Sequence, residues 1–210
     1  MNSSSTPSYY WANSLGRFML LALEEVLGRN GLNAVLHRKN LGAFVNHYPP
    51  NNSKHLFDYL TVSQIHSALE EYYGPRGGRG ISLRAGRAWF TLVLREFSIP
   101  MHFLDLPNRV ASMDTKQRQV LQVLAEIYQQ HSDMQVQVET QPGKYVWHVA
   151  RCAICWERHS QESECHFHVG SLQEALYWAS GGKLFFVEEQ ACCAKGDSAC
   201  TFVIDAQAFG

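Results

Sequence analysis

The chain has 210 residues, enough for one moderately large domain that folds without covalent cross-links. Its 18 Lys and Arg nearly balance 19 Asp and Glu, which excludes a charge signature for nucleic acid or an anionic membrane surface. The sequence shows no secretory signal pattern and no apolar stretch of about 20 residues. We therefore expect a soluble cytoplasmic protein without a membrane span.

The first part of the chain is predicted to be helical. Apolar residues recur at helical spacing over residues 15–28, and Gly28 stands where a helix C-cap is expected. A second, short helix is expected over 32–45. The Pro and Asn content of residues 46–55 then predicts a loop.

A third helix is expected over residues 61–74, with Thr61 or Ser63 as its N-cap. The glycines of "GPRGGRG", residues 74–80, are spaced as in loops that bind phosphate through backbone N–H groups. However, no strand precedes them and the Lys-Ser/Thr ending of a phosphate loop is missing. This segment is therefore predicted to be a flexible connection between helices.

Two further helices are expected over residues 82–97 and 113–132. Gly86 in the first of them predicts the close approach of a neighbouring helix. In the second, Asp114 can act as a cap, and one face is apolar. That face comprises Val120, Leu121, Leu124, Ile127 and Tyr128.

The hydrophobic period changes to two from Met134 onward, which is typical of strands. A hairpin is predicted over 134–156, a short helix over 171–182, and two more strands over 183–192 and 200–206. The fold class is therefore predicted as α+β, with N-terminal helices packed on a C-terminal antiparallel sheet.

The domain organisation follows from this division of the chain. We expect residues 1–12 to be a flexible N-terminus and residues 13–210 to be a single domain. Within that domain, 13–132 form the mainly helical part, and 133–210 form the sheet part with a metal site.

All six cysteines lie in the sheet part, between residues 152 and 200. In a reducing compartment, clustered cysteines are more often metal ligands or catalytic thiols than disulfides. Glu189 and Cys192 leave one strand together, and Cys200 begins the next strand after a Gly-Asp turn, so the three can share one zinc ion. The fourth ligand is left open among Cys165, His166 and His168.

Three other cysteines have simpler interpretations. Cys152 and Cys155 form a C-x-x-C pair within a strand pattern, where alternation sends the two side chains to opposite faces and disfavours a redox role. Cys193 would point away from Cys192 and act as a small buried hydrophobic residue. His166 and His168, on one face of an expected strand, are interpreted as ordinary partly buried histidines.

An ordered motif runs through the last third of the chain: Cys165 and Gly170 in "CHFHVG", Glu189 and Cys192 in "EEQAC", and Cys200 before "TFVI". It resembles the 4-vinyl reductase-type domain family, named after a bacteriochlorophyll biosynthesis protein and found as an aromatic-sensing module. The resemblance implies a fold like that of transport-particle (TRAPP) subunits and a homodimer formed through the N-terminal helices.

The resemblance also implies a structural zinc ion held by Cys165, Glu189, Cys192 and Cys200, with Glu188 as an alternative to Glu189. Beside it, the resemblance implies a buried pocket for a small hydrophobic molecule. Trp156 resembles the family's pocket tryptophan, and Phe186 is a second candidate for ligand binding.

The function expected from the resemblance is a zinc-containing binding domain for an aromatic compound or a tetrapyrrole precursor, with a sensory or biosynthesis-accessory role. The alternative is a (bacterio)chlorophyll-precursor vinyl reductase or its assembly subunit. Reduction of a vinyl group needs a nicotinamide or flavin, and the sequence has no dinucleotide-binding fingerprint after a strand. Catalysis is therefore disfavoured.

Overall fold

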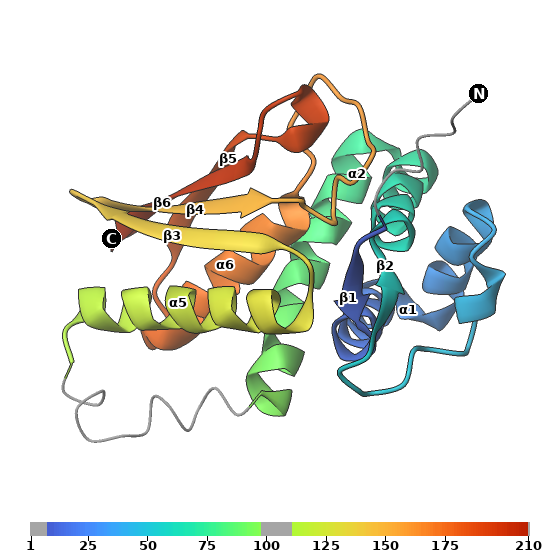
Figure 1. The fold of residues 1–210 in the computed structure, drawn as a ribbon, viewed down its shortest axis with the longest axis horizontal. Coiled ribbons are helices and arrows are strands. Elements are labelled where there is room, and N and C mark those ends of the chain that lie inside the picture. The colour runs from blue at the N-terminus through green and yellow to red at the C-terminus, as the bar shows by residue number, and fades with distance from the viewer. Residues whose placement is uncertain (1–7, 98–110, 210) are drawn as a thin grey trace.

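A computed structural model describes residues 8–97 and 111–209. The described chain has an α+β fold, as predicted: helices of the first half lie beside a four-stranded antiparallel sheet built by the second half (Figure 1). None of the described helices combines the length and the apolar character that a membrane crossing requires.

Helix α1 (Asn13–Arg38) is kinked at Gly28, where the sequence predicts the end of a helix. Gly28 has φ 71° and ψ 161°, a conformation that glycine adopts far more readily than other residues. The helix resumes after the kink, so the separate helix expected over 32–45 is the end of α1 followed by the single turn η1 (Gly42–Phe44).

Two short strands that the sequence did not indicate join the halves of the molecule. Strand β1 (Tyr10–Ala12) pairs antiparallel with β2 (His55–Asp58), so the end of the expected flexible terminus is ordered. The carbonyl of Tyr10 accepts the N–H of Asp133 at 3.0 Å. The indole N–H of the fully buried Trp11 lies 3.2 Å from the sulfur of Met134. The N-terminal strand is thereby attached to the start of the main sheet.

Helix α2 (Tyr59–Glu96) is longer than the sequence predicts. Gly74 forms a second kink, with φ 75° and ψ 161°, and Pro75 follows it where a helix tolerates a missing N–H. The residues expected to be a flexible connection, 75–80, are therefore helical, and the prediction of a loop was wrong.

The N-cap of α2 is Asp58, three residues before the predicted Thr61. The Asp58 carboxylate accepts the Thr61 N–H at 2.7 Å and the Thr61 hydroxyl at 2.8 Å. Asp58→Ala should therefore lower the free energy of unfolding by about 1 kcal/mol. Urea denaturation followed by circular dichroism checks this. Asp58→Asn keeps a cap oxygen and should lose much less; an equal loss in both variants would contradict the capping role.

The second half begins with α5 (Met113–His131), which has the predicted apolar face buried and Ser112, not Asp114, as its N-cap. The four strands follow in the spatial order β3-β4-β6-β5, and all neighbours are antiparallel. Helix α6 (His166–Ala179) lies between β4 and β5 in the chain. The strands are β3 (Gln135–Gln141), β4 (Lys144–Ala150), β5 (Phe185–Ala191) and β6 (Cys200–Ala208).

Helices α2 and α6 contact each other directly through their backbones. A Cβ atom at Gly86 would lie 2.0 Å from the carbonyl oxygen of Phe167, and one at Gly170 would lie 2.0 Å from that of Leu83. The close approach predicted at Gly86 is therefore confirmed. It fixes the start of α6, where Cys165 lies, against the helical half.

An aromatic layer fills the space between these helices and the sheet. Trp89 of α2 stacks on Tyr128 of α5 with ring centroids 5.2 Å apart, and Trp147 and Phe202 contribute rings from the sheet. All four are fully buried. This layer belongs to the same hydrophobic core as the buried cysteines.

Candidate metal centre

The turn after β4 carries the first two cysteines. The predicted strand ends early, at Ala150, because Arg151 adopts a left-handed conformation with φ 54°. Cys152 and Cys155 then lie in a turn and are buried to 1% and 2% exposure. The prediction that they occupy opposite faces of a strand was therefore wrong.

A second turn, between β5 and β6, carries two cysteines, and a third begins β6. Cys192 follows β5, the single turn η2 (Cys193–Lys195) comes next, and Gly196 closes it with φ 98°. The Asp197 carboxylate accepts the N–H of Cys192 at 2.8 Å and thereby fixes the turn. Cys200 then begins β6, as the sequence predicts.

Cys165 comes from a third element, as the residue that caps the N-terminus of α6. His166 and His168 follow on that helix, so the strand expected for them does not exist. His168 is fully buried, and its Nδ1 lies 3.4 Å from the Tyr128 hydroxyl. Burial lowers the pKa of His168 to about 4, which keeps this imidazole neutral.

The cysteine sulfurs of these three elements meet in the interior. The Sγ–Sγ distances are 3.5 Å for Cys152–Cys165, 3.4 Å for Cys155–Cys200, 3.7 Å for Cys165–Cys200 and 3.9 Å for Cys165–Cys192. A disulfide would be about 2.05 Å long, and all six cysteines are free. Four thiolates around one ion, with bonds of about 2.3 Å, are spaced by roughly 3.8 Å.

Two overlapping sets of ligand atoms result, and within each set all atoms lie within 4.8 Å of one another. One contains Cys165, Glu189, Cys192 and Cys200, the four residues that the motif singles out. The other contains Cys152, Cys155, Cys165 and Cys200. The sequence did not lead us to predict Cys152 and Cys155 as possible metal ligands, although their C-x-x-C spacing is itself a frequent metal-ligand pattern.

The Glu189 side chain faces the cluster, whereas Glu188 is exposed and interacts with Gln190. The Oε2 atom of Glu189 accepts the Cys165 N–H at 2.8 Å, and its Oε1 atom is buried without a hydrogen-bond partner. Burial, followed by the adjacent Cys192, raises the pKa of the Glu189 carboxyl to about 9. Of the two candidate glutamates, Glu189 is therefore the one that can bind an ion here.

The pKa values of the cluster thiols are shifted in both directions. Burial raises the pKa of the Cys152 thiol to about 11 and that of Cys165 well above its usual range, whereas hydrogen bonds from neighbouring thiols, first that of Cys152, lower the pKa of Cys155. A bound metal ion would deprotonate the thiols that coordinate it, because only deprotonated sulfur is a ligand. The N–H of Cys193, whose side chain lies outside both sets, donates to the sulfur of Cys200 at 3.3 Å.

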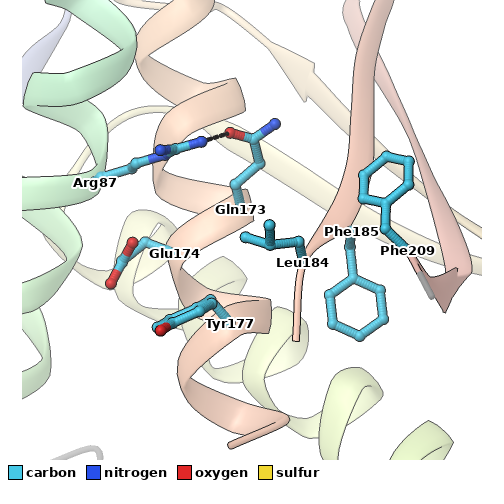
Figure 2. A pocket seen from close by; sticks show the side chains of 7 residues that line it. All are labelled: Arg87, Gln173, Glu174, Tyr177, Leu184, Phe185 and Phe209. Atoms are coloured by element: carbon cyan, nitrogen blue, oxygen red, sulfur yellow. Dashed lines mark hydrogen bonds between the residues drawn. The ribbon is translucent and has the colours of Figure 1, made fainter. Parts of the chain in front are cut away.

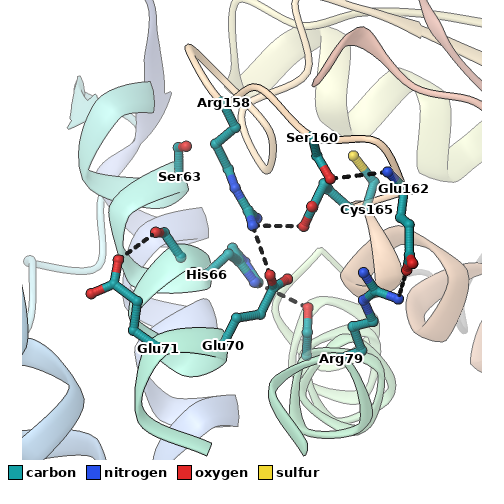
Figure 3. Close-up of polar contacts among 12 residues, drawn as sticks. Ser63, His66, Glu70, Glu71, Arg79, Arg158, Ser160, Glu162 and Cys165 are labelled. Atoms are coloured by element: carbon teal, nitrogen blue, oxygen red, sulfur yellow. Dashed lines mark hydrogen bonds and ion pairs between the residues drawn. The ribbon is translucent and has the colours of Figure 1, made fainter. Parts of the chain in front are cut away.

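A partly buried ion-pair network attaches the cysteine-bearing segment to α2 (Figure 3). The guanidinium of Arg158 contacts the carboxylates of Glu164 at 2.6 Å and Glu70 at 3.1 Å. The Glu164 side chain is only 4% exposed. Burial and the hydrogen bond from Glu164 raise the pKa of Glu70 to about 6. Arg158 therefore connects the residue before Cys165 to the helical half.

The two residues expected to bind a hydrophobic ligand lie in different environments. Trp156 packs against Tyr9 and Tyr59, with ring centroids 5.1 and 5.8 Å apart. Phe186 is 43% exposed. A surface pocket of about 250 Å³ lies between α6 and β5 and is shown in Figure 2, but neither residue lines it. Its lining residues are Arg87, Gln173, Glu174, Tyr177, Leu184, Phe185 and Phe209.

The arrangement of helices and sheet is similar to that of solved H-NOX proteins. The Fe(II)NO form of an H-NOX protein from S. oneidensis matches with a TM-score of 0.57 and 12% identity, covering 92% of this chain and 99% of that one. The Fe(II) unliganded H-NOX protein from K. algicida matches at 0.59 and 10%, covering 95% and 97%. A structure from work on heme distortion in the H-NOX family matches at 0.61 and 13%, covering 92% and 94%.

At these identities the likeness concerns the fold alone. No protein-family model and no curated protein matches the sequence. The fold match contradicts the resemblance to 4-vinyl reductase-type domains and transport-particle subunits, which rested on a handful of motif positions.

The functions that followed from that resemblance are corrected with it. The zinc cofactor, the hydrophobic-ligand domain, the vinyl reductase alternative and the place in bacteriochlorophyll biosynthesis are not supported, because the matching structures are heme proteins of the H-NOX type. Clustered cysteines alone do not identify zinc. Their position in the fold nevertheless stands as a feature of this chain.

Proposed function

We propose that this chain is a non-catalytic sensor domain built on the H-NOX fold, whose responsive centre is a buried metal–thiolate site. The observation that carries this proposal is the meeting of five buried cysteine sulfurs and the Glu189 carboxylate at the junction of β4, β6 and α6. A change at this centre is transmitted to α6, because Cys165 immediately precedes that helix.

A heme is the other candidate, since the matching H-NOX structures contain one. A heme needs an axial ligand such as His, Cys, Met or Tyr beside a slot that holds a large planar macrocycle. Among the described residues, His66 and His168 are buried imidazoles whose Nε2 atoms lack a hydrogen-bond partner. The packing around these two atoms decides whether a heme fits.

Aromatic rings surround both imidazoles. His168 lies 5.4 Å from the ring of Tyr128 and 5.7 Å from that of Phe202, and His66 lies 5.3 Å from Phe167. Helices α2 and α6 touch through their backbones beside them, so the helices cannot be parted by a macrocycle without unfolding this crossing. The packing of the described residues therefore does not fit a heme, and we derive no role for one.

The test compares the two cofactors directly on the whole chain. The protein is purified under reducing, anaerobic conditions, its metal content is measured by elemental analysis, and it is titrated with hemin. We expect at least one thiolate-bound metal ion per chain and no stoichiometric hemin complex. A one-to-one hemin complex with a sharp Soret band, or a chain that binds no metal ion through its cysteines, would overturn the proposal.

The sensory part of the proposal has its own readout. Hydrogen exchange of the α6 backbone should slow at least tenfold when the metal is bound, because Cys165 is then fixed at the helix start. Exchange in α1, which contributes no ligand, should change little and serves as the internal reference. The homodimer that the sequence suggests through the N-terminal helices stays a prediction.

A further inference from the structure

The two ligand sets of the cysteine cluster overlap in two residues and differ in the other two. Each contains four atoms within 4.8 Å of one another, which is what one tetrahedral ion needs, and the sets share only Cys165 and Cys200. A single ion bound by either set therefore leaves two buried groups of the other set without a cation.

We infer that the cluster is a binuclear site, in which two thiophilic divalent ions share the thiolates of Cys165 and Cys200 as bridging ligands. This inference rests on the proposed metal–thiolate function and specifies its stoichiometry. One ion is completed by Cys152 and Cys155, and the other by Glu189 and Cys192.

The sulfur positions agree with two coordination tetrahedra that share one edge, the line between the sulfurs of Cys165 and Cys200. Cys165 and Cys200 lie 3.7 Å apart, close to the separation of two thiolates on one ion. Each also contacts a residue that belongs to only one set: Cys165 lies 3.5 Å from Cys152 and 3.9 Å from Cys192, and Cys200 lies 3.4 Å from Cys155. The sulfur of Cys165 thus contacts one residue that belongs only to the first set and one that belongs only to the second.

An unpaired atom supports the second ion independently. The Oε1 atom of Glu189 is buried without a hydrogen-bond partner, although its Oε2 atom is fixed by the Cys165 N–H. A buried carboxyl oxygen without a partner costs free energy, which a cation at this position would recover. Filling the Cys152–Cys155 set alone would leave this oxygen unpaired.

The charge balance also favours two ions. Five thiolates and one carboxylate carry six negative charges when all are ionised, and two dications reduce this to two. The bound ions displace protons from the thiols and the carboxyl, and these protons pass to the solvent.

Cobalt titration of the reduced whole chain tests this inference, because Co²⁺ reports its own coordination. We expect two Co²⁺ per chain by native mass spectrometry, with thiolate-to-cobalt charge-transfer absorption. We also expect a magnetic moment per cobalt below that of isolated tetrahedral Co²⁺, because shared thiolates couple the two spins. This coupling distinguishes a bridged pair from two separate sites.

Variants assign the ions to their ligands. Cys152→Ser with Cys155→Ser should reduce the stoichiometry from two to one and remove the coupling, and so should Glu189→Gln with Cys192→Ser. Cys165→Ser, which removes a bridge, should weaken both ions. Cys193→Ser is the matched control, because its side chain belongs to neither set, and it should keep two coupled ions.

The outcomes separate the two proposals. One Co²⁺ in the unmodified chain, or two without spin coupling, overturns the binuclear site and leaves the metal–thiolate function standing. No thiolate-bound Co²⁺ overturns both. The unmodified chain decides between these outcomes, so a variant that fails to fold does not affect the conclusion.

Discussion

Gly86→Ala is expected to destabilise the protein by about 3 kcal/mol or more, the upper end of the cost of overpacking. The added methyl group would lie 2.0 Å from the Phe167 carbonyl oxygen. That oxygen belongs to backbone and cannot rotate away as a side chain could. Helices α2 and α6 would have to separate, and the aromatic layer beneath them would lose contacts. Urea denaturation followed by far-ultraviolet circular dichroism measures the loss.

Gly80→Ala is the matched control for this substitution. Gly80 lies in the same helix and is exposed, and no atom outside its own stretch of helix lies within 4 Å of the position that an added methyl group would take. Alanine there should stabilise the protein by about 0.5–1 kcal/mol, because it favours helix. If Gly86→Ala did not lower the free energy of unfolding, as Gly80→Ala is not expected to, the backbone contact between α2 and α6 would not exist in solution.

Arg158→Met is expected to lower the free energy of unfolding by about 3 kcal/mol, the lower end of the cost of breaking a buried ion pair, because it leaves the buried carboxylate of Glu164 and the partly buried one of Glu70 without their shared cation. Glu70 and Glu164 would then face each other as like charges. Methionine keeps much of the length of the side chain, so the decrease in the free energy of unfolding arises more from the missing charge than from lost packing. Chemical denaturation near pH 7 measures it.

The loss in Arg158→Met should depend on pH in a defined direction. The folded-state pKa of Glu70, already raised to about 6, rises further when the guanidinium is removed. A carboxyl with a raised folded-state pKa favours the folded state below its unfolded pKa, and this contribution is lost as the pH rises through the folded value. The deficit should therefore be smaller at about pH 5 than at pH 7.

Arg118→Met is the control for a surface ion pair. Arg118 pairs with Asp114, and their side chains are 54% and 48% exposed. Its removal should leave the free energy of unfolding almost unchanged, because water screens this pair. Equal losses at Arg118 and Arg158 would show that the network beside Cys165 is not a buried one.

Local patterns were sufficient to predict much of the fold. The change from helical to alternating period at Met134 correctly predicted the hairpin of β3 and β4, and the apolar stripe from Val120 to Tyr128 predicted the buried face of α5. Both signals arise from neighbours in the chain, which is why a single sequence contains them.

The wrong predictions concern segments whose secondary structure is determined by one unusual backbone conformation or by a contact with a residue far away in the sequence. Alternation continues in the sequence past Ala150, but the left-handed backbone of Arg151 ends the strand and turns both Cys152 and Cys155 toward the cluster. The glycines after Gly74 look like a loop, yet Gly78 packs on the backbone of Glu70 across the kink, and this contact favours helix.

The proximity of the four motif residues was predicted correctly, whereas the fold family was not, and the difference has a physical reason. The motif reports short-range geometry, two strands joined by a tight turn, and the structure does bring Cys165, Glu189, Cys192 and Cys200 together. Fold identity depends on how α2 crosses α6 and where the strands lie in the sheet. A few motif residues do not specify those features.

The crossing of α2 and α6 has a consequence during synthesis on the ribosome. The last residue of α2 is Glu96 and the first of α6 is His166, so at roughly 5–20 residues per second several seconds pass between them. Throughout that interval Trp89 and Phe90 have no α6 to cover them. The nascent chain thus presents the apolar side of α2 that later faces α6 without its cover, and such exposed apolar surface is what chaperones bind.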